Sequence, residues 1–194
     1  MINVDRLADT FLQLVEIDSV SKQEGEFARE LQRLFEALGA ETVVDDAGSK
    51  TGSNTGNLIV RFKGDRQVPP LLLNAHMDTV QPGEGIRAVY ENGKFTSEGA
   101  TILGADDKSA IAILLETVRV LKEKDLAHGP LELVFTICEE IGLIGAKNFD
   151  FSLISANYGY ALDATDTEGI VTRAPSANRF QLTIHGKDAH AEER

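Results

Sequence analysis

The stretch LVFTICEEIGLIGAKNF, residues 133–149, contains an apolar run that is followed directly by two acidic residues. Its apolar start, Leu133 to Cys138, predicts a buried β-strand, because short apolar runs bounded by turns are typical of strands covered on both faces. The run ends in two adjacent carboxylates, Glu139 and Glu140. Like charges in that position repel each other and lose hydration. Two interpretations are open: a divalent cation compensates the pair, or both side chains begin an exposed turn.

Helical and strand patterns alternate on both sides of this stretch. A capping box from Ser21 to Glu24 introduces one of the helices. Apolar spacing predicts helices over residues 3–17, 26–39, 107–125 and 146–150. Apolar or alternating runs predict strands over residues 41–46, 57–64, 69–78, 131–138 and 158–162, with a further strand pair at 169–173 and 178–185.

The alternation of helices with apolar strands predicts the fold class. It indicates an α/β protein, a three-layer α/β/α sandwich with a mostly parallel, mixed sheet. Residues 86–99 contain Asn92-Gly93 between alternating segments, which predicts a β-hairpin. We interpret this hairpin as a sign that the sheet is mixed and not purely parallel.

Length and charge narrow the classes of function. A chain of 194 residues suits one domain with room for the start of a second. The net charge of −12 argues against nucleic acid and anionic membrane as partners, because their phosphates would be repelled. A solvated acidic surface explains most of this charge, which is also compatible with a cation site built from carboxylates.

The remaining features of composition concern the compartment. Cys138 is the single cysteine, so the chain cannot form an internal disulfide. The N-terminus lacks the basic start and apolar core of a signal peptide, and no run is long enough to span a bilayer. These features predict a cytoplasmic protein.

Two segments besides the opening stretch offer ligand pairs. His76 and Asp78 in NAHMDTV are two residues apart and share one face if the strand persists, but they could simply cap the strand end. Asp106 and Asp107 in LGADDKSA stand where a loop meets a helix, and a plain helix N-cap is the alternative.

A fourth segment, YGYALDATD, places Asp163 after another apolar strand. Sites in open α/β sheets form outside the carboxyl ends of the strands, so all four segments are expected to meet there. One histidine with several carboxylates suits Zn²⁺, and an open position for water would make such a site hydrolytic. Together the segments predict a metal site without identifying a substrate.

The motifs NAHMDTV, LGADDKSAIAILLE, CEEIGLIGAKNF and YALDATD, in this order, resemble the dizinc exopeptidase family of tripeptidase T, carboxypeptidase G and the acylamino-acid deacylases. LGADDK and EEIGLIGAK are most similar to the tripeptidase T branch. The resemblance covers nearly the whole chain. It implies a zinc-exopeptidase-like fold and a peptide hydrolase with two Zn²⁺ ions, with Co²⁺ or Mn²⁺ as alternatives.

The resemblance also implies roles for individual residues. Asp78 matches the residue that orients the site, and Glu139 matches the general base that takes a proton from water. The implied metal ligands are His76 and Asp163 for the first zinc, Asp106 as the bridge, and Glu140 for the second zinc. The peptide bond that follows Asp106 is expected to be cis.

The chain departs from the family pattern near its end. Residues 1–176 are expected to form an incomplete catalytic domain, and residues 177–194 the first strand of a lid domain that also forms homodimers in the family. His190 matches the lid histidine that polarises the substrate. A histidine ligand of the second zinc would lie in an absent C-terminal segment, so we expect a fragment with little activity of its own.

Three functions are weighed on this basis. The first is a tripeptidase or aminopeptidase acting on short peptides. The second is a deacylase or carboxypeptidase of the same family, which lid residues would distinguish. The third is a domain that binds a metal or a peptide without catalysis, and the presence of Glu139 argues against it.

Overall fold

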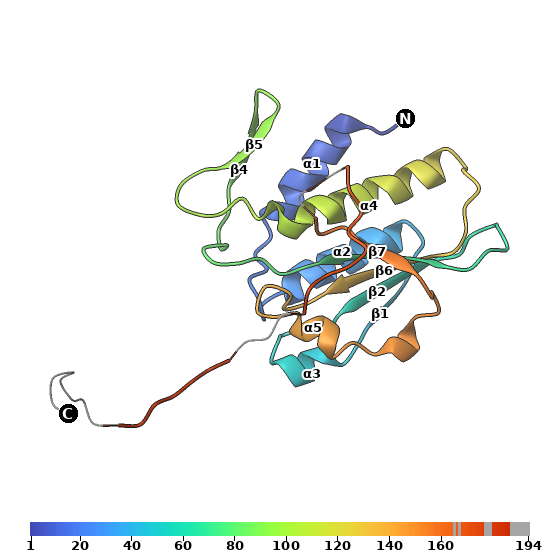
Figure 1. Ribbon diagram of the computed structural model, residues 1–194. Coiled ribbons are helices and arrows are strands. Elements are labelled where there is room, and N and C mark those ends of the chain that lie inside the picture. The colour runs from blue at the N-terminus through green and yellow to red at the C-terminus, as the bar shows by residue number, and fades with distance from the viewer. Residues whose placement is uncertain (165, 167, 177–179, 187–194) are drawn as a thin grey trace. The chain divides into compact units, whose positions relative to one another are not determined.

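The computed structural model describes residues 1–164, 166, 168–176 and 180–186. Two compact units divide the chain, Met1–Ala164 and Thr165–Arg194. The first unit contains every helix and strand described below (Figure 1). The domain boundary expected between residues 176 and 177 stays a prediction.

A five-stranded mixed sheet forms the centre of the first unit. Its strands lie in the order β1 (Glu41–Val44), β2 (Leu58–Phe62), β6 (Leu131–Thr136), β3 (Leu71–His76) and β7 (Gly159–Ala161). Strand β3 runs parallel to both β6 and β7, whereas β2 is antiparallel to its two neighbours. Strand β2 therefore makes the sheet mixed, and the other four strands share one direction.

The predicted hairpin exists but does not join this sheet. Strands β4 (Ala88–Glu91) and β5 (Lys94–Ser97) form a two-stranded sheet of their own. Asn92 and Gly93 have positive φ angles of 54° and 77°, as the tight turn between twisted strands requires. The sheet is mixed, as predicted, but strand β2 is the cause and the hairpin is not part of it.

Long helices cover one face of the sheet and short helices the other, which confirms the three-layer α/β/α architecture (Figure 1). On the first face, α1 (Val4–Val15) packs on α4 (Ala105–Glu123), α4 contacts β3, and α2 (Gly25–Ala37) contacts β1 and β2. The short helices α3 (Ala47–Thr51) and α5 (Ile144–Lys147) contact each other.

Alternation along the strands supplies the main core. Leu58, Val60 and Phe62 of β2 and Leu133 and Phe135 of β6 are buried in one hydrophobic cluster with the long helices. Successive strand side chains point to opposite faces, so these five residues share the face that α1, α2 and α4 cover. The pattern that predicted buried strands therefore also fixes which face receives the long helices.

Several predicted elements differ from the structure. The strand pair expected at 169–173 and 178–185 is absent from the described residues 168–176 and 180–186. A strand is held by hydrogen bonds to a partner, and sequence alternation supplies no partner. The short helix expected at 146–150 lies at Ile144–Lys147, followed by a 3₁₀ turn at Phe151–Leu153. Within the described residues, no helix is both long and apolar enough to cross a membrane.

Candidate metal centre

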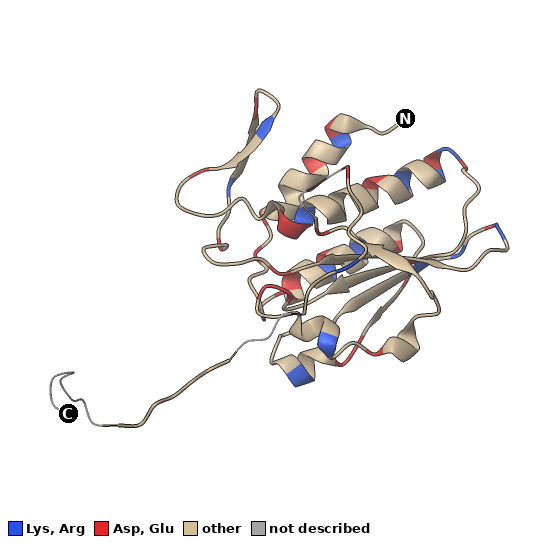
Figure 2. Cartoon of the chain, in the orientation of Figure 1, with Lys and Arg blue, Asp and Glu red and all other residues tan. Residues whose placement is uncertain are grey.

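The candidate site lies where parallel strands end and α4 begins. His76, the last residue of β3, pairs in register with Thr136, the last residue of β6. Acidic residues are found at the start of α4 and in the loop after β6 (Figure 2). The residues of interest here are His76, Asp78, Asp106, Asp107, Glu139, Glu140 and Asp163.

Two groups of side chains are close enough to share a cation. His76, Asp106 and Asp163 offer ligand atoms that all lie within 4.8 Å of one another, and His76, Glu139 and Glu140 form a second such group. His76 Nε2 is 3.0 Å from Asp106 Oδ1. The five residues that the resemblance implies as ligands or base are thus brought together from four separate segments. Their individual roles stay predictions.

Asp78 occupies a different place in the same site. Its side chain is buried, and its carboxylate accepts hydrogen bonds from the backbone N–H of Glu139 at 2.8 Å and of Glu140 at 3.2 Å. The Ser21 hydroxyl donates a third hydrogen bond at 2.6 Å. Asp78 Oδ1 also lies 3.5 Å from His76 Nδ1. These contacts suit a residue that orients the turn after β6 rather than a cation ligand.

Asp107 lies in the protein interior and belongs to neither ligand group. It is buried, and its Oδ2 accepts a hydrogen bond from the backbone N–H of His76 at 3.2 Å. The Asp106–Asp107 peptide bond is cis, as the resemblance implies. The two adjacent aspartates therefore serve different purposes: Asp106 faces the site and Asp107 supports the end of β3.

The electrostatics of the pair Glu139 and Glu140 favour a bound positive charge. Partial burial is the main cause that raises the pKa of each carboxyl above its ordinary value, and neighbouring carboxylates add to it, although His76 acts in the opposite direction. A raised pKa means that the ionised form is disfavoured when only protein groups are present. A cation would remove that penalty.

Without a metal ion, His76 and Asp107 of this site bind protons more tightly than usual. Burial alone would lower the pKa of His76, but the nearby carboxylates of Asp78, Asp106 and Asp107 outweigh it and raise the pKa to about 10. Burial raises the pKa of Asp107 to about 7. A metal ion would compete with these protons, because imidazole and carboxylate bind metals in their deprotonated forms.

The residues present fit a divalent cation. His76 Nδ1 is buried and forms no hydrogen bond, its nearest acceptor being Asp78 Oδ1 at 3.5 Å. Among the described residues, the ion pairs of these carboxylates involve His76 and no lysine or arginine. One imidazole with several carboxylate oxygens is a donor set that Zn²⁺ accepts. The arrangement can therefore hold a metal ion.

The capping-box prediction was wrong, and its two residues support the site instead. Glu24 is the N-cap residue of α2, yet its side chain makes no capping hydrogen bond. Ser21 binds Asp78, and Glu24 accepts a hydrogen bond from the backbone N–H of Cys138 at 3.0 Å. A Ser-x-x-Glu pattern looks the same whether its side chains bond locally or to distant segments. No sequence signal distinguished these residues.

The lid histidine His190 lies outside the described residues, so its role stays a prediction.

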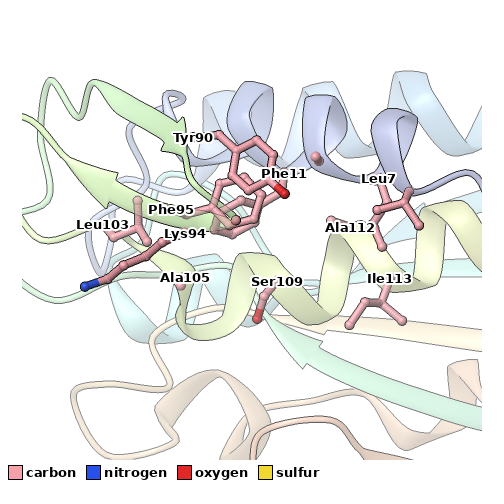
Figure 3. A pocket seen from close by; sticks show the side chains of 13 residues that line it. Leu7, Phe11, Tyr90, Lys94, Phe95, Leu103, Ala105, Ser109, Ala112 and Ile113 are labelled. Atoms are coloured by element: carbon pink, nitrogen blue, oxygen red, sulfur yellow. The ribbon is translucent and has the colours of Figure 1, made fainter.

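An apolar cavity of about 490 Å³ lies elsewhere, between α1, the β4–β5 hairpin and α4. Phe11, Tyr90, Phe95 and Ile113 line it (Figure 3). None of the candidate ligands lines this cavity, so it is a separate feature from the metal centre.

Two solved structures of known proteins resemble this chain in fold and sequence. The crystal structure of aminopeptidase PepT from Bacillus cereus ATCC 10987 matches 84% of this chain with a TM-score of 0.82 and 45% identity. A tripeptidase from Staphylococcus aureus matches 86% of the chain with a TM-score of 0.83 and 41% identity. These matches confirm the predicted resemblance to the tripeptidase T branch.

The chain spans about half the length of the relatives it matches. An uncharacterised protein of Bacillus subtilis (strain 168), YqjE, is 46% identical over 192 residues, which is 98% of this chain and 52% of the relative. The two solved structures are covered to 44% and 45%. The profile of peptidase family M28 matches residues 57–174, more than half of this chain. On that evidence the chain belongs to peptidase family M28.

Proposed function

We propose that the complete protein is a metal-dependent hydrolase that releases N-terminal residues from short peptides. The observation that carries this proposal is the pair of ligand groups around His76 at the ends of β3 and β6. Membership of a peptidase family and similarity to an aminopeptidase and a tripeptidase support the substrate class. A cytoplasmic location is part of the proposal and is supported by the single, buried cysteine.

We infer that the metal is zinc and that the complete site holds two ions. Zn²⁺ supplies Lewis acidity, which lowers the pKa of water and polarises a carbonyl group. His76 and Asp163 would hold the first ion, Asp106 would bridge, and Glu140 would hold the second ion. His76 belongs to both ligand groups, which supports a single compact centre.

In this proposal Glu139 is the general base. It is half-buried and its pKa is raised, mainly by burial, which suits a carboxylate that accepts and then releases a proton. It would take a proton from water and pass it to the leaving amine. Asp78 accepts a hydrogen bond from the backbone N–H of Glu139. This contact holds the backbone of the base and leaves its carboxylate available to water.

A substrate panel with the full-length protein tests the proposed function. We expect hydrolysis of tripeptides with a free N-terminus, loss of activity after chelation, and recovery with Zn²⁺. Cleavage of N-acetylated substrates, or of the C-terminal residue alone, would contradict an aminopeptidase and favour a deacylase or carboxypeptidase. Metal binding without hydrolysis of any substrate would contradict an enzyme.

The Glu139→Gln variant tests the general base. We expect kcat to fall by about 10²–10⁴-fold, the range that general acid–base groups contribute, while metal content stays at the level of the unchanged protein. Glu98→Gln, which alters an exposed glutamate outside the candidate centre, is the matched control. Retained activity in Glu139→Gln would sink the assignment.

We also propose that residues 177–194 begin a lid domain that dimerises and that His190 contacts the substrate carbonyl. The match of GKDAHA to the family motif supports this role. In the full-length protein, His190→Ala should lower kcat by about 10²-fold or more without changing metal content. Light scattering of the full-length protein should then detect a dimer.

A further inference from the structure

Three consecutive backbone N–H groups in the turn after β6 are bound by two buried carboxylates. Asp78 accepts the N–H groups of Glu139 and Glu140, as described above. Glu24 Oε1 accepts the N–H of Cys138 at 3.0 Å. Two separate carboxylates thus hold the turn that carries Glu139 and Glu140.

Glu24 is fully buried and has a complete set of partners. Its Oε1 also accepts the backbone N–H of Lys22 at 3.0 Å, and its Oε2 accepts the Ser53 hydroxyl at 2.6 Å. The Cys138 thiol donates to the same Oε1 at 3.4 Å. Four hydrogen bonds hold the Glu24 carboxylate in one position. The backbone N–H of Cys138, which donates one of them, is therefore held in place as well.

The conformation of Cys138 shows why this acceptor matters. Its φ angle is 53°, which lies in the left-handed region that L-residues seldom adopt, and its side chain is buried. The backbone turns sharply here, between the end of β6 and the two glutamates. An acceptor placed on the Cys138 N–H holds that turn, and with it the direction in which the next two side chains leave the backbone.

The connection between α1 and α2 supports both carboxylates. Ser21 from this connection donates to Asp78, and Thr79 exchanges backbone hydrogen bonds with the same connection at Ser19 and Ser21. Glu24 lies at its end. One short segment therefore braces the end of β3 and the turn after β6 together.

We propose that Glu24 is a positioning residue for the metal centre, acting through the backbone of Cys138 to aim Glu139 and Glu140. Its function is to accept hydrogen bonds at a fixed place, and its negative charge is secondary. The proposal rests on the proposed function only for its effect on catalysis. Its effects on backbone protection and on metal affinity stand without it.

Two substitutions separate the reach of Glu24 from its charge. Glu24→Asp keeps the charge but withdraws the carboxylate from Cys138 by one methylene. Glu24→Gln keeps the reach, because its oxygen can still accept both amides and its NH₂ group faces the Ser53 hydroxyl, which can accept. Both variants retain a polar side chain at a polar buried position.

Glu132 provides a matched control on the same strand. It is 5% exposed at the start of β6, where it accepts the backbone N–H groups of Ser155 and Ala156. The Ser155 hydroxyl donates to it as well, at 2.7 Å. It is therefore another buried carboxylate that holds a loop, but at the strand end opposite the site. Glu132→Asp shortens it by the same methylene.

The test measures Co²⁺ binding by its visible spectrum and, in the metal-free chain, the hydrogen exchange of amides 138–140. For Glu24→Asp we expect Co²⁺ affinity to fall by about 10–100-fold, the range for residues that orient metal ligands, and these amides to exchange faster. For Glu24→Gln and Glu132→Asp we expect affinities within about threefold of the unchanged chain and equal exchange at 138–140. In the full-length protein, kcat should follow the same order.

Two results would overturn the proposal. Equal losses of Co²⁺ affinity in Glu24→Asp and Glu132→Asp would reduce Glu24 to a general stabilising residue. A loss in Glu24→Gln as large as that in Glu24→Asp would show that charge is what matters. If the full-length protein hydrolysed no peptide, the proposed function would fail, and the Co²⁺ and exchange measurements would still decide the role of Glu24.

Discussion

Two carboxylate clusters among the described residues differ in what balances their charge, and an arginine of the chain balances one of them. Between α1 and α4, the Arg6 guanidinium binds Glu116, with Nε 2.7 Å from Oε2, and also contacts Glu123. These hydrogen bonds lower the pKa of both glutamates. The ionised form is therefore favoured there without any ligand.

The metal centre shows the opposite behaviour. Burial raises the pKa of Glu139 and Glu140, and among the described residues the cationic partner of the site's carboxylates is His76. The same residue type thus has its pKa shifted in opposite directions at two places in one chain. The Arg6 cluster is therefore complete within the chain, whereas the charges of the metal centre favour a cation from outside the chain.

Zinc should have the largest effect, and only at the metal centre. At a Zn²⁺ concentration of about 100 times Kd, binding adds about 2.7 kcal/mol to the free energy of unfolding. For a chain of this size that shift raises Tm by roughly 5–10 °C. Differential scanning calorimetry of the 194-residue chain, with and without chelator, measures it.

Two variants decide whether that shift belongs to the metal centre. Asp106→Asn should lose most of the zinc-induced rise in Tm, because it removes a carboxylate from one ligand group. Glu116→Gln should begin from a lower Tm and keep the whole rise. A rise that survives in Asp106→Asn, or that disappears in Glu116→Gln, would break the contrast between the two regions.

The metal-free chain should become less stable as pH rises. A group whose pKa is higher in the folded chain binds more protons there, so raising the pH destabilises the fold. The pKa of Asp107 is raised by burial to about 7, and that of His76 reaches about 10 through its carboxylate neighbours. Burial lowers the pKa of Lys108 to about 7, and this shift offsets part of the decline above pH 7. We expect the free energy of unfolding to fall by roughly 1–3 kcal/mol between about pH 5 and pH 9.

Denaturant titrations at successive pH values, with chelator present, measure this decline. Asp107→Asn should flatten its lower half, because an amide does not titrate. Saturating Zn²⁺ should reverse the slope, since metal binding releases the protons. A metal-free chain whose stability rose with pH over this range would contradict the proton-filled site that the structure indicates.

The Arg6 cluster should respond to mutation by a smaller amount and to pH in the other direction. Glu116→Gln removes a charged acceptor whose side chain is 2% exposed, and we expect a loss of about 1–2 kcal/mol at pH 7. The lowered pKa of Glu116 stabilises the fold above the ordinary value of 4.5, and this contribution disappears as pH falls through the folded value. The variant should therefore lose less stability in acid than the unchanged chain. Chemical denaturation at pH 7 and at pH 3 tests both points.

The sequence predicted the location of the candidate ligands better than it predicted the residues that orient them. The ends of parallel strands meet at one edge, so ligand residues after β3, β6 and β7 had to be neighbours. Apolar spacing predicted the long helices, and alternation around Asn92-Gly93 predicted the hairpin, for similar local reasons. The roles of Ser21 and Glu24 could not be predicted, because their partners lie 57 and 114 residues away along the chain.

Partners were also the reason why other expectations failed. Residues 169–173 carry a strand pattern, but a pattern does not supply the neighbouring strand that would hold it. The hairpin satisfies its own hydrogen bonds, and so nothing required it to join the central sheet. The local signal was correct for the hairpin and wrong for residues 169–173, and in both cases the sequence did not reveal the tertiary contact that decided the outcome.

The smallest effect should come from an ion pair with a similar separation in a different environment. Lys63 Nζ lies 2.8 Å from Glu41 Oε1, a distance almost equal to that between Arg6 and Glu116, but the two side chains are 88% and 64% exposed. Exposed pairs are hydrated and screened by salt, so forming one changes stability little. Lys63→Ala should leave both Tm and the zinc-induced rise unchanged in calorimetry. A loss of Tm as large as that in Glu116→Gln would mean that separation, and not burial, decides which carboxylates need a partner, and the case for an external cation at Glu139 and Glu140 would lose its physical basis.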